Sequence, residues 1–568
     1  MSATHEVANQ VPPLEGYDAL AGDRWLARAL EGSKAIGPGS AGARAERAGS
    51  AEEVPRGFVE RAAELGRYVG SAEAREHARL ANAHPPVLRT HDGQGRRVDF
   101  VEYHPSYHAL MARAIGSGLH SLAWKERPAG FTHRAALCYL WNQLEQGTAC
   151  PVTMTFAAIP VFAHAPLLDA GWRAKVLADA YDARPLPVAR KEGATIGMAM
   201  TEKQGGSDLR AVATLAREDG EGWRLTGHKW FCSAPMSDAF FTLARLPEGV
   251  TCFFVPRTLE DGSRNPFEIQ RLKEKVGNRS NASAEIEYRD TWAQRVGEPG
   301  RGIATLIEMA HHTRFDIVVA AAGMMRMGLD HALHHASYRS AFGKALVEQP
   351  AMRNVLADLA LEAEAAALLA FRLAGAFDAG VDSESERELQ RVLTPVAKYW
   401  LCKRLVPFAG EAMECIGGNG YVEESPLARL YREAPLNGIW EGSANVICLD
   451  VLRAISRSPR SLEALAAEIE AGGEPRARAA FDRALALLDR HSGTGHPGED
   501  QARATVERLA LAVQGALMRR HSSDAAAQAF AQSRLEGGTG TRAFGTLEAN
   551  ADMAAILAGA RRAVDEPP

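Results

Sequence analysis

Two short segments of this chain carry residues that can do chemistry. One of them sets a single carboxylate, Glu441, between the large aromatic Trp440 and the pair Gly442 and Ser443. A carboxylate that an aromatic neighbour shields from water has a raised pKa and can act as a base. Much earlier, residues 198–208 form a polar, glycine-bearing turn after an apolar run, and its backbone N–H groups can bind an anion. Together the two segments suggest a flavin site with a base beside it.

These segments belong to a wider set of motifs. Together with residues 339–344 and 416–421 they resemble the acyl-CoA dehydrogenase flavoprotein superfamily over roughly residues 130 to 455. Four further stretches are similar to the branch of that superfamily named for the adaptive-response protein AidB. They are residues 150–157, 227–231, 277–283 and 445–453. This closer similarity extends over nearly the whole chain.

The resemblance implies a role for Glu441. A flavin that takes hydride from the β-carbon of a thioester needs a base for the α-proton, and Glu441 stands where the superfamily has that base. A lone glutamate is usually a surface or capping residue, but this motif favours the base. The resemblance also places Arg314 near the substrate entrance. A buried ion pair with Asp316 or another acid explains that arginine equally well.

The resemblance further implies FAD as cofactor and names the residues that bind it. They are Met200, Thr201, Gly205, Gly206 and Ser207 of the turn, Phe231, Cys232 and Ser233 along the flavin face, and Ile439, Trp440, Gly442, Ser443 and Asn445 around the base. Ser443 and Asn445 are expected to bond the adenosine-side phosphates and ribose. Cys232 departs from the threonine that the superfamily commonly has, and a thiol is a poor donor towards a flavin nitrogen.

Another group of residues concerns subunit assembly. Arg339, Phe342 and Gln349 match the motif that, in the superfamily, reaches the dinucleotide of a neighbouring subunit. Gly417 and Gly418 match the loop that lets that neighbour approach. The resemblance therefore implies a homo-oligomer, a tetramer built as a dimer of dimers. Arg339 taken alone would more often be a solvated charge.

Size and composition limit the remaining function classes. The chain has 568 residues, more than one hydrophobic core usually serves, and 46% of them are apolar. Its net charge of -5 gives no general attraction to nucleic acid or anionic membrane. The sequence shows neither a signal peptide nor a membrane span, so a cytoplasmic protein without membrane contact is expected. Acyl-CoA is the small-molecule partner that the resemblance implies.

Cysteines and histidines give no sign of a metal site. The seven cysteines are scattered and never form a Cys-x-x-Cys pair, which predicts reduced, packed thiols. His331 and His335 stand four residues apart, a spacing able to bind zinc, but no third ligand lies nearby. We therefore expect no metal.

Hydrophobic periodicity predicts a mainly α protein with a central β domain. The expected parts are an arm (1–55), a helical domain (56–194), a β barrel or sandwich (195–300), a helical bundle (301–455) and a C-terminal helical domain (456–568). The longest predicted helices cover residues 303–340, 349–378 and 388–417. The predicted strands include residues 223–226, 240–244, 250–255 and 284–288. The same α, β, α order is implied by the acyl-CoA dehydrogenase fold.

The C-terminal region needs its own explanation, because ordinary acyl-CoA dehydrogenases end soon after the bundle. Residues 456–568 hold 14 arginines, no lysine and 15 acidic residues. Arg503, Arg508, Arg519 and Arg520 lie off an apolar helical stripe, and the AidB resemblance implies that such arginines could form a duplex DNA-binding face. The candidates for that face are Arg519 and Arg520, with Arg453. The balance of charge makes a solvated surface an equally good explanation.

Two functions remain open. The first is a DNA-associated flavoprotein of the alkylation-damage response, in which acyl-CoA dehydrogenation is weak or vestigial. The second is a working short-chain or branched-chain acyl-CoA dehydrogenase, similar to an isovaleryl-CoA enzyme, that uses Glu441 as base and FAD as hydride acceptor. A helical protein without cofactor is disfavoured by the flavin motifs.

Overall fold

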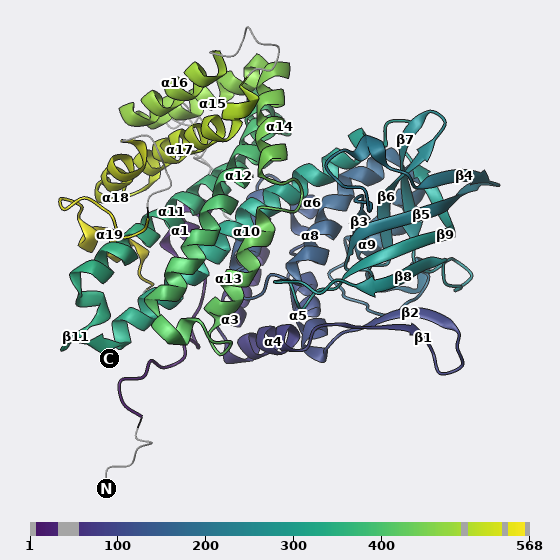
Figure 1. The fold of residues 1–568 in the computed structure, drawn as a ribbon, viewed down its shortest axis with the longest axis horizontal. Coiled ribbons are helices and arrows are strands. Elements are labelled where there is room, and N and C mark those ends of the chain that lie inside the picture. Colours follow the sequence, from purple (N-terminus) through teal and green to yellow (C-terminus); the bar gives the residue numbers. More distant parts are fainter. Residues whose placement is uncertain (1–6, 32–55, 490–497, 537–542, 563–568) are drawn as a thin grey trace. The chain divides into compact units, whose positions relative to one another are not determined.

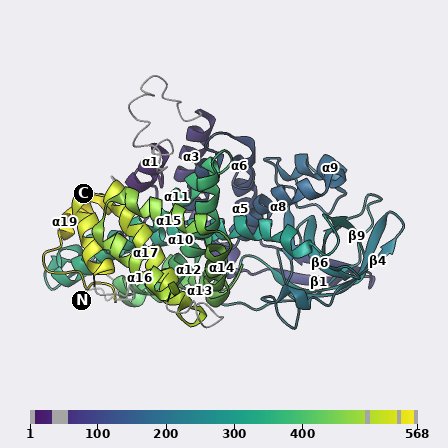
Figure 2. The ribbon, with the colours of Figure 1, turned by 90° about the horizontal axis from the view of Figure 1, so that it is seen from above.

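The computed structural model describes residues 7–31, 56–489, 498–536 and 543–562. The chain divides into two compact units (Figures 1 and 2). Unit 1 comprises the described residues up to Ala72, Phe131–Leu144 and the described residues from Ile317 onward. Unit 2 comprises Glu73–Gly130 and Glu145–Asp316.

Unit 2 is built around a seven-stranded sheet. Its strands are β3 (Ile196–Ala199), β4 (Leu215–Asp219), β5 (Gly222–Ser233), β6 (Ala239–Leu246), β7 (Gly249–Pro256), β8 (Phe267–Leu272) and β9 (Ser283–Val296). Strand β6 pairs with β3, β4 and β7, while β9 pairs with β5, β7 and β8. Since β4 also pairs with β5, five strands close into a ring. The predicted barrel is confirmed, and Phe240, Phe253, Phe267 and Tyr288 belong to its core.

Helices and one hairpin complete unit 2. The helices are α4 (Ala72–Ala83), α5 (Pro105–Gly116), α6 (Leu122–Lys125), α8 (Ala149–Ala158), α9 (Pro166–Val176) and the start of α10 (Gly302–Tyr338). Within the block predicted as helical, β1 (Val87–His91) and β2 (Arg97–Glu102) form an antiparallel pair. The hairpin was not predicted.

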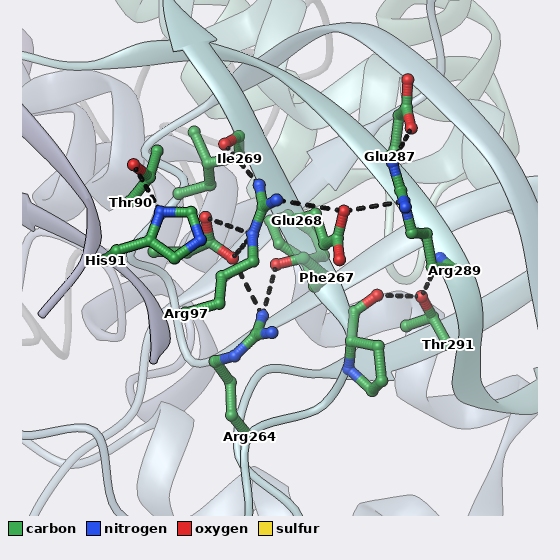
Figure 3. A network of polar contacts seen from close by, with 12 residues as sticks. Thr90, His91, Arg97, Arg264, Phe267, Glu268, Ile269, Glu287, Arg289 and Thr291 are labelled. Atoms are coloured by element: carbon green, nitrogen blue, oxygen red, sulfur yellow. Dashed lines mark hydrogen bonds and ion pairs between the residues drawn. The ribbon is translucent and has the colours of Figure 1, made fainter. Parts of the chain in front are cut away.

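A buried aspartate, Asp99, fixes that hairpin to the barrel, and Figure 3 labels its two partners Arg97 and Arg264. The side chain of Asp99 is fully buried and accepts hydrogen bonds from Nε of Arg97 and Nη1 of Arg264, each at 2.9 Å. Arg97 also donates to the carbonyl oxygen of Ile269 in β8 at 3.0 Å. A buried carboxylate is costly without partners, and the contacts with these two guanidinium groups offset that cost.

In its described residues, unit 1 consists of helices with their connections and one small hairpin. Its helices are α1 (Arg24–Glu31), α3 (Arg56–Val69), α7 (Gly130–Trp141), the rest of α10, α11 (Pro350–Ala379), α12 (Glu384–Cys415), α13 (Pro426–Asn437), α14 (Ala444–Arg457), α15 (Pro459–Gly472), α16 (Pro475–Asp489), α17 (Ala502–His521), α18 (Asp524–Phe530) and α19 (Met553–Ala560). The hairpin pairs β10 (Ser340–Ala341) with β11 (Lys344–Ala345). The three long helices predicted from periodicity are therefore confirmed, with ends displaced by at most a few residues.

The C-terminal helices are joined to the bundle by buried ion pairs. Helix α12 packs against α14, α15 and α17, and α11 packs against α17 and α19 (Figure 2). Nε of Arg372 in α11 lies 2.8 Å from Glu468 in α15, and its Nη2 lies 2.9 Å from Glu386 in α12. Arg534 likewise pairs with Asp358 and Glu362 of α11. Residues from both predicted helical regions, 301–455 and 456–568, therefore share one compact unit.

The seven cysteines are all buried and free, as predicted. Among the described residues, no helix has the length and apolar character required to cross a membrane. The same residues hold no group of three or more His, Cys, Asp or Glu side chains able to bind a metal ion.

Candidate functional site

The polar turn after β3, in unit 2, is anchored by a buried carboxylate. Glu202 accepts hydrogen bonds from Nζ of Lys229 at 2.7 Å and from Oγ1 of Thr214 at 2.6 Å, and both members of the ion pair have fully buried side chains. Burial opposes ionisation, but the ammonium group of Lys229 and these hydrogen bonds lower the pKa of Glu202 to about 2. The N–H of Gly205 bonds back to the carbonyl of Glu202 at 3.0 Å. The turn is thus a fixed feature of the barrel.

The two glycines of the turn are required by its shape. Gly205 has a φ of +140°, and a Cβ at Gly206 would lie 2.3 Å from Oγ1 of Thr201. Gly205 and Ser207 are exposed, while Met200 and Thr201 are half-buried. The turn therefore presents backbone without side-chain obstruction, which fits the approach of a phosphate or a flavin edge.

The end of β5 lies beside this turn. The N–H of Trp230 donates to the carbonyl of Thr201 at 2.8 Å. Phe231 is half-exposed and Ser233 half-buried, whereas Cys232 has no exposed surface and belongs to the barrel core. Burial raises the pKa of the Cys232 thiol to about 12. The predicted contact of Cys232 with flavin therefore needs revision, because a ligand at this surface can meet the residue only through its backbone.

A lysine that the sequence did not single out covers the aromatic residues of β5. Nζ of Lys273 lies 3.4 Å from the centre of the Trp230 ring and 4.8 Å from that of Phe231. The same ammonium group pairs with Glu285 at 2.6 Å. Cations favour the face of an aromatic ring, so this contact stabilises the orientation of Trp230.

The candidate base lies in unit 1, in the short connection between α13 and α14. Glu441 has a left-handed backbone, with a φ of +56°, and Gly442 follows with a φ of +110°. Its neighbour Trp440 is half-buried, and the indole N–H of that residue is buried without a hydrogen-bond partner among the described residues. Ile439 is 63% exposed. A strained residue next to an unpaired buried donor is typical of a binding or catalytic position.

A buried lysine holds this connection in place. Nζ of Lys398, in α12, donates to the carbonyl oxygen of Gly442 at 2.5 Å, and Lys398 is only 1% exposed. The lysine lies in the middle of a helix and belongs to no motif, so it could not be predicted from the sequence. Its ammonium group constrains the peptide that follows Glu441.

The start of α14 carries the two residues predicted to bond the adenosine side of the cofactor. Ser443 is the N-cap residue of α14 and is exposed, and its side chain makes no capping hydrogen bond. Asn445 is exposed in the first turn, where its Oδ1 accepts a hydrogen bond from Nε of Arg503 at 2.7 Å. Arg503 belongs to α17 and was not predicted as part of the flavin site. The uncapped N–H groups and polar side chains here suit a phosphate group.

The predicted assembly motif forms the hairpin of β10 and β11. Phe342 and Gly343 have φ values of +53° and +79°, as the two-residue turn of a type I′ hairpin requires. Phe342 is 98% exposed at the tip. Nε2 of Gln349 donates to the carbonyl of Ala341 at 3.0 Å and so steadies the base of the hairpin.

The first described residues of the N-terminal arm, around Asn9, lie on this hairpin. Nδ2 of Asn9 donates to the carbonyl of Ser340 at 2.8 Å, and the N–H of Ser340 donates to Oδ1 of Asn9 at 2.9 Å. Arg339 donates through Nη1 to the carbonyl of Asn9. His334 bonds the carbonyl of Pro12 at 2.7 Å. Arg339 is thus held by the arm of its own chain.

The glycine loop after α12 is open to its surroundings. Gly417 has a φ of +69°, and within the described residues nothing lies within 4 Å of a Cβ built on Gly417 or Gly418. Packing among the residues that the structure describes therefore does not explain Gly418, and the loop leaves room for an approaching group.

The remaining predicted residues differ in exposure. Arg314, in α10, is 8% exposed. Arg519 pairs with Asp524 at 2.7 Å, and Arg520 pairs with the fully buried Glu468 at 2.9 Å. Arg453 is exposed on α14. Of the three candidate DNA contacts, Arg453 alone is exposed and makes no ion pair with the described residues.

Comparison with known families gives three matches along the chain. They are the adaptive response protein AidB N-terminal domain over residues 9–183, the acyl-CoA dehydrogenase middle domain over residues 197–291 and the acyl-CoA dehydrogenase C-terminal domain over residues 300–456. The third match ends where the C-terminal region begins.

Individual relatives agree with these matches. AidB of Escherichia coli (strain K12) is 45% identical over 488 residues, which cover 84% of this chain and 88% of that protein. Acyl-CoA dehydrogenase family member 11 of Caenorhabditis elegans is 30% identical and covers 80% of this chain and 79% of its own length. The crystal structure of Caenorhabditis elegans ACDH-11 in complex with C11-CoA aligns with a TM-score of 0.80 at 26% identity, over 94% of this chain and 93% of that one. The structure named Bd2924 apo-form aligns with a TM-score of 0.78 at 27% identity, over 90% and 99% of the two chains. The chain therefore belongs to the acyl-CoA dehydrogenase family and carries the N-terminal domain of AidB.

Proposed function

We propose that this chain is an FAD-binding acyl-CoA oxidoreductase of the AidB type, in which Glu441 removes the α-proton of a thioester. The observation that carries this proposal is the left-handed backbone of Glu441. A residue other than glycine loses about 1 kcal/mol or more in that conformation, and such strain persists mainly where function needs it. An ordinary surface glutamate would not require it.

The residues around the two motifs fit FAD. The turn at Gly205 and Gly206 offers unobstructed backbone, and the start of α14 offers uncapped N–H groups for a phosphate. The orphaned indole N–H of Trp440 is a further donor beside the base. When bound, FAD supplies the acceptor for the β-hydride of the substrate.

Within this proposal Glu441 has one task. Its carboxylate takes the α-proton of the acyl chain and becomes a neutral carboxylic acid, while the α-carbon keeps the electron pair that forms the double bond to the β-carbon. Lys398 fixes the peptide after Glu441, so the carboxylate starts from a defined backbone. An acyl-CoA substrate agrees with the C11-CoA bound to the Caenorhabditis elegans relative.

The direct test is an anaerobic titration of the purified yellow protein with acyl-CoA thioesters. We expect the absorption band of oxidised flavin to disappear when a substrate is added. A comparison of isovaleryl-CoA with C11-CoA shows whether the protein prefers short branched acyl chains or longer straight ones. Glu441→Gln should abolish that loss of absorption while leaving bound FAD unchanged. If the wild-type protein binds FAD but no thioester reduces the flavin absorption band, the proposed oxidation of acyl-CoA is rejected.

A second candidate function is duplex DNA binding. The exposed Arg453 favours it, whereas the pairing of Arg519 and Arg520 with acids weakens their part in a phosphate-binding face. Because Arg519 and Arg520 already pair with acidic side chains, Arg453 is the principal candidate for a contact with DNA. A phosphate contact of this kind gives binding that weakens as salt rises.

Fluorescence anisotropy with a labelled duplex tests this function across a range of salt concentrations. We expect Arg453→Gln to weaken binding several-fold and to reduce the salt slope by about one. Arg217→Gln, which removes an exposed arginine from the barrel, serves as the control. Binding that is unaffected by Arg453→Gln would reject this contact, and no binding by the wild-type protein would reject the function.

We also propose a homo-oligomer, in which a second copy covers Phe342. The nearly complete exposure of this aromatic side chain on a rigid hairpin supports the proposal, as does the open loop at Gly417 and Gly418. Large apolar side chains that stand exposed on a fixed element are typical of interfaces.

A further inference from the structure

One contact links the C-terminal region to the flavin motif. Arg503 is the second residue of α17, and its Nε donates to Oδ1 of Asn445 at 2.7 Å. Helices α14 and α17 pack against each other and both pack against α12, so the contact joins two fixed elements. No other hydrogen bond of the Arg503 guanidinium group or of the Asn445 side chain is formed within the described residues.

The chemistry of the two side chains decides which way the amide faces. A guanidinium group has donors only, whereas an asparagine amide has an oxygen acceptor on one side and an NH₂ donor on the other. With its oxygen turned to Arg503, Asn445 presents its Nδ2 donors elsewhere. The first turn of α14 also presents backbone N–H groups, because Ser443 supplies no side-chain cap. This end of α14 therefore offers donors rather than a mixture of donors and acceptors.

We propose that Arg503 is a positioning residue for FAD: it fixes the amide of Asn445 so that only donors face the acceptor oxygens of the cofactor. The inference rests on the proposed FAD site and adds a residue from the region after the third family match. It gives that region a role in cofactor binding. A free asparagine would spend part of its time with its oxygen towards a phosphate, which repels it.

The test is the affinity of the apo protein for FAD, measured by flavin fluorescence quenching on the full chain. Arg503→Met removes the donor and keeps the apolar stem, and we expect about fivefold weaker binding, the value of one hydrogen bond. Asn445→Ala should weaken binding to a similar or greater degree. Arg508→Met is the matched control, since within the described part of the chain the guanidinium group of Arg508 bonds only the carbonyl of Ala504 in its own helix.

The double variant separates positioning from direct contact. If Arg503 acts through Asn445, then Arg503→Met adds nothing in the Asn445→Ala background. A further loss of affinity there would show that Arg503 meets the cofactor itself and would overturn the proposal, as would unchanged affinity in Arg503→Met alone. Thermal unfolding of the apo variants distinguishes either result from misfolding. If the wild-type chain takes up no FAD, the proposed function fails instead.

Discussion

Lys398 and Gly442 are joined by a hydrogen bond of 2.5 Å between a buried ammonium group and a backbone carbonyl oxygen. The carbonyl belongs to the residue after Glu441, so a cation in the middle of α12 constrains the strained connection that carries the candidate base. Burying an ammonium group is costly. We infer that the position which Lys398 imposes on this connection explains the lysine better than stability does.

Replacing Lys398 with methionine should uncouple stability from activity. The variant loses a buried charge as well as a hydrogen bond, so we expect a small change in the free energy of unfolding. The rate of flavin reduction by a thioester should fall about tenfold or more, because small displacements of a catalytic group are costly. Stopped-flow absorbance measures the rate and urea unfolding measures the stability. Lys403→Met, at an exposed position of the same helix, should change neither; an unchanged rate in Lys398→Met would reject the positioning role.

The ion pair of Glu202 and Lys229 should make the free energy of unfolding of the barrel depend on pH. Because the folded-state pKa of Glu202 is lowered to about 2 from 4.5, its contribution is complete above about pH 5 and is lost as the pH falls towards 2. Between about pH 4 and pH 2 this single group should lower the free energy of unfolding by up to about 1.4 kcal/mol for each pH unit of acidification.

The double variant Glu202→Gln with Lys229→Met isolates that contribution, since it removes both buried charges together. Urea unfolding of the wild-type protein and of this variant should give curves of stability against pH that converge as the solution becomes more acidic. Glu218→Gln, at an exposed position of β4, should run parallel to the wild type. A constant difference between wild type and double variant would show that Glu202 has an ordinary pKa.

The elements that carry the site could be predicted from sequence because their signals are local. Apolar periodicity located the long helices and the strands, and the glycines at 205 and 206 marked a turn that only glycine fits. The burial of Cys232 could not be predicted from alternation along the strand. The pairing register of β5 shifts between Lys229 and Cys232, so the fully buried Lys229 and the half-exposed Phe231 break the alternating pattern.

The residues that hold the site in place could not be predicted in this way. Lys398 is 44 positions from Gly442 and Arg503 is 58 positions from Asn445, and neither stands in a motif. Such contacts depend on how helices pack, which the pattern of one helix does not specify. The N-terminal arm shows the same limit, because Asn9 bonds Ser340 across 331 positions.

Arg534 should be a large contributor to the stability of unit 1. Although burial opposes ionisation, the guanidinium groups of Arg404 and Arg534 lower the pKa of Glu362. Arg534→Met would leave Asp358 and part of the charge of Glu362 buried without compensation, and we expect a loss of about 3–5 kcal/mol in urea unfolding. Arg476→Met, which breaks an exposed pair with Glu536, should cost less than about 1 kcal/mol. Equal losses would show that the buried network is not what joins the C-terminal helices to the bundle.

Phe342 offers a way to weaken assembly without weakening the fold. Its left-handed backbone at the first central position of a type I′ turn suits asparagine better than phenylalanine, so Phe342→Asn should leave the hairpin intact or stabilise it. Loss of one buried aromatic side chain from an interface should raise the dissociation constant about tenfold or more. Sedimentation equilibrium measures that constant, and Val381→Asn, at another exposed apolar position, is the control. Because the substitution keeps the turn intact, an unchanged dissociation constant in Phe342→Asn would show that the exposed ring does not contact a second copy. A monomeric wild-type protein would reject the proposed oligomer.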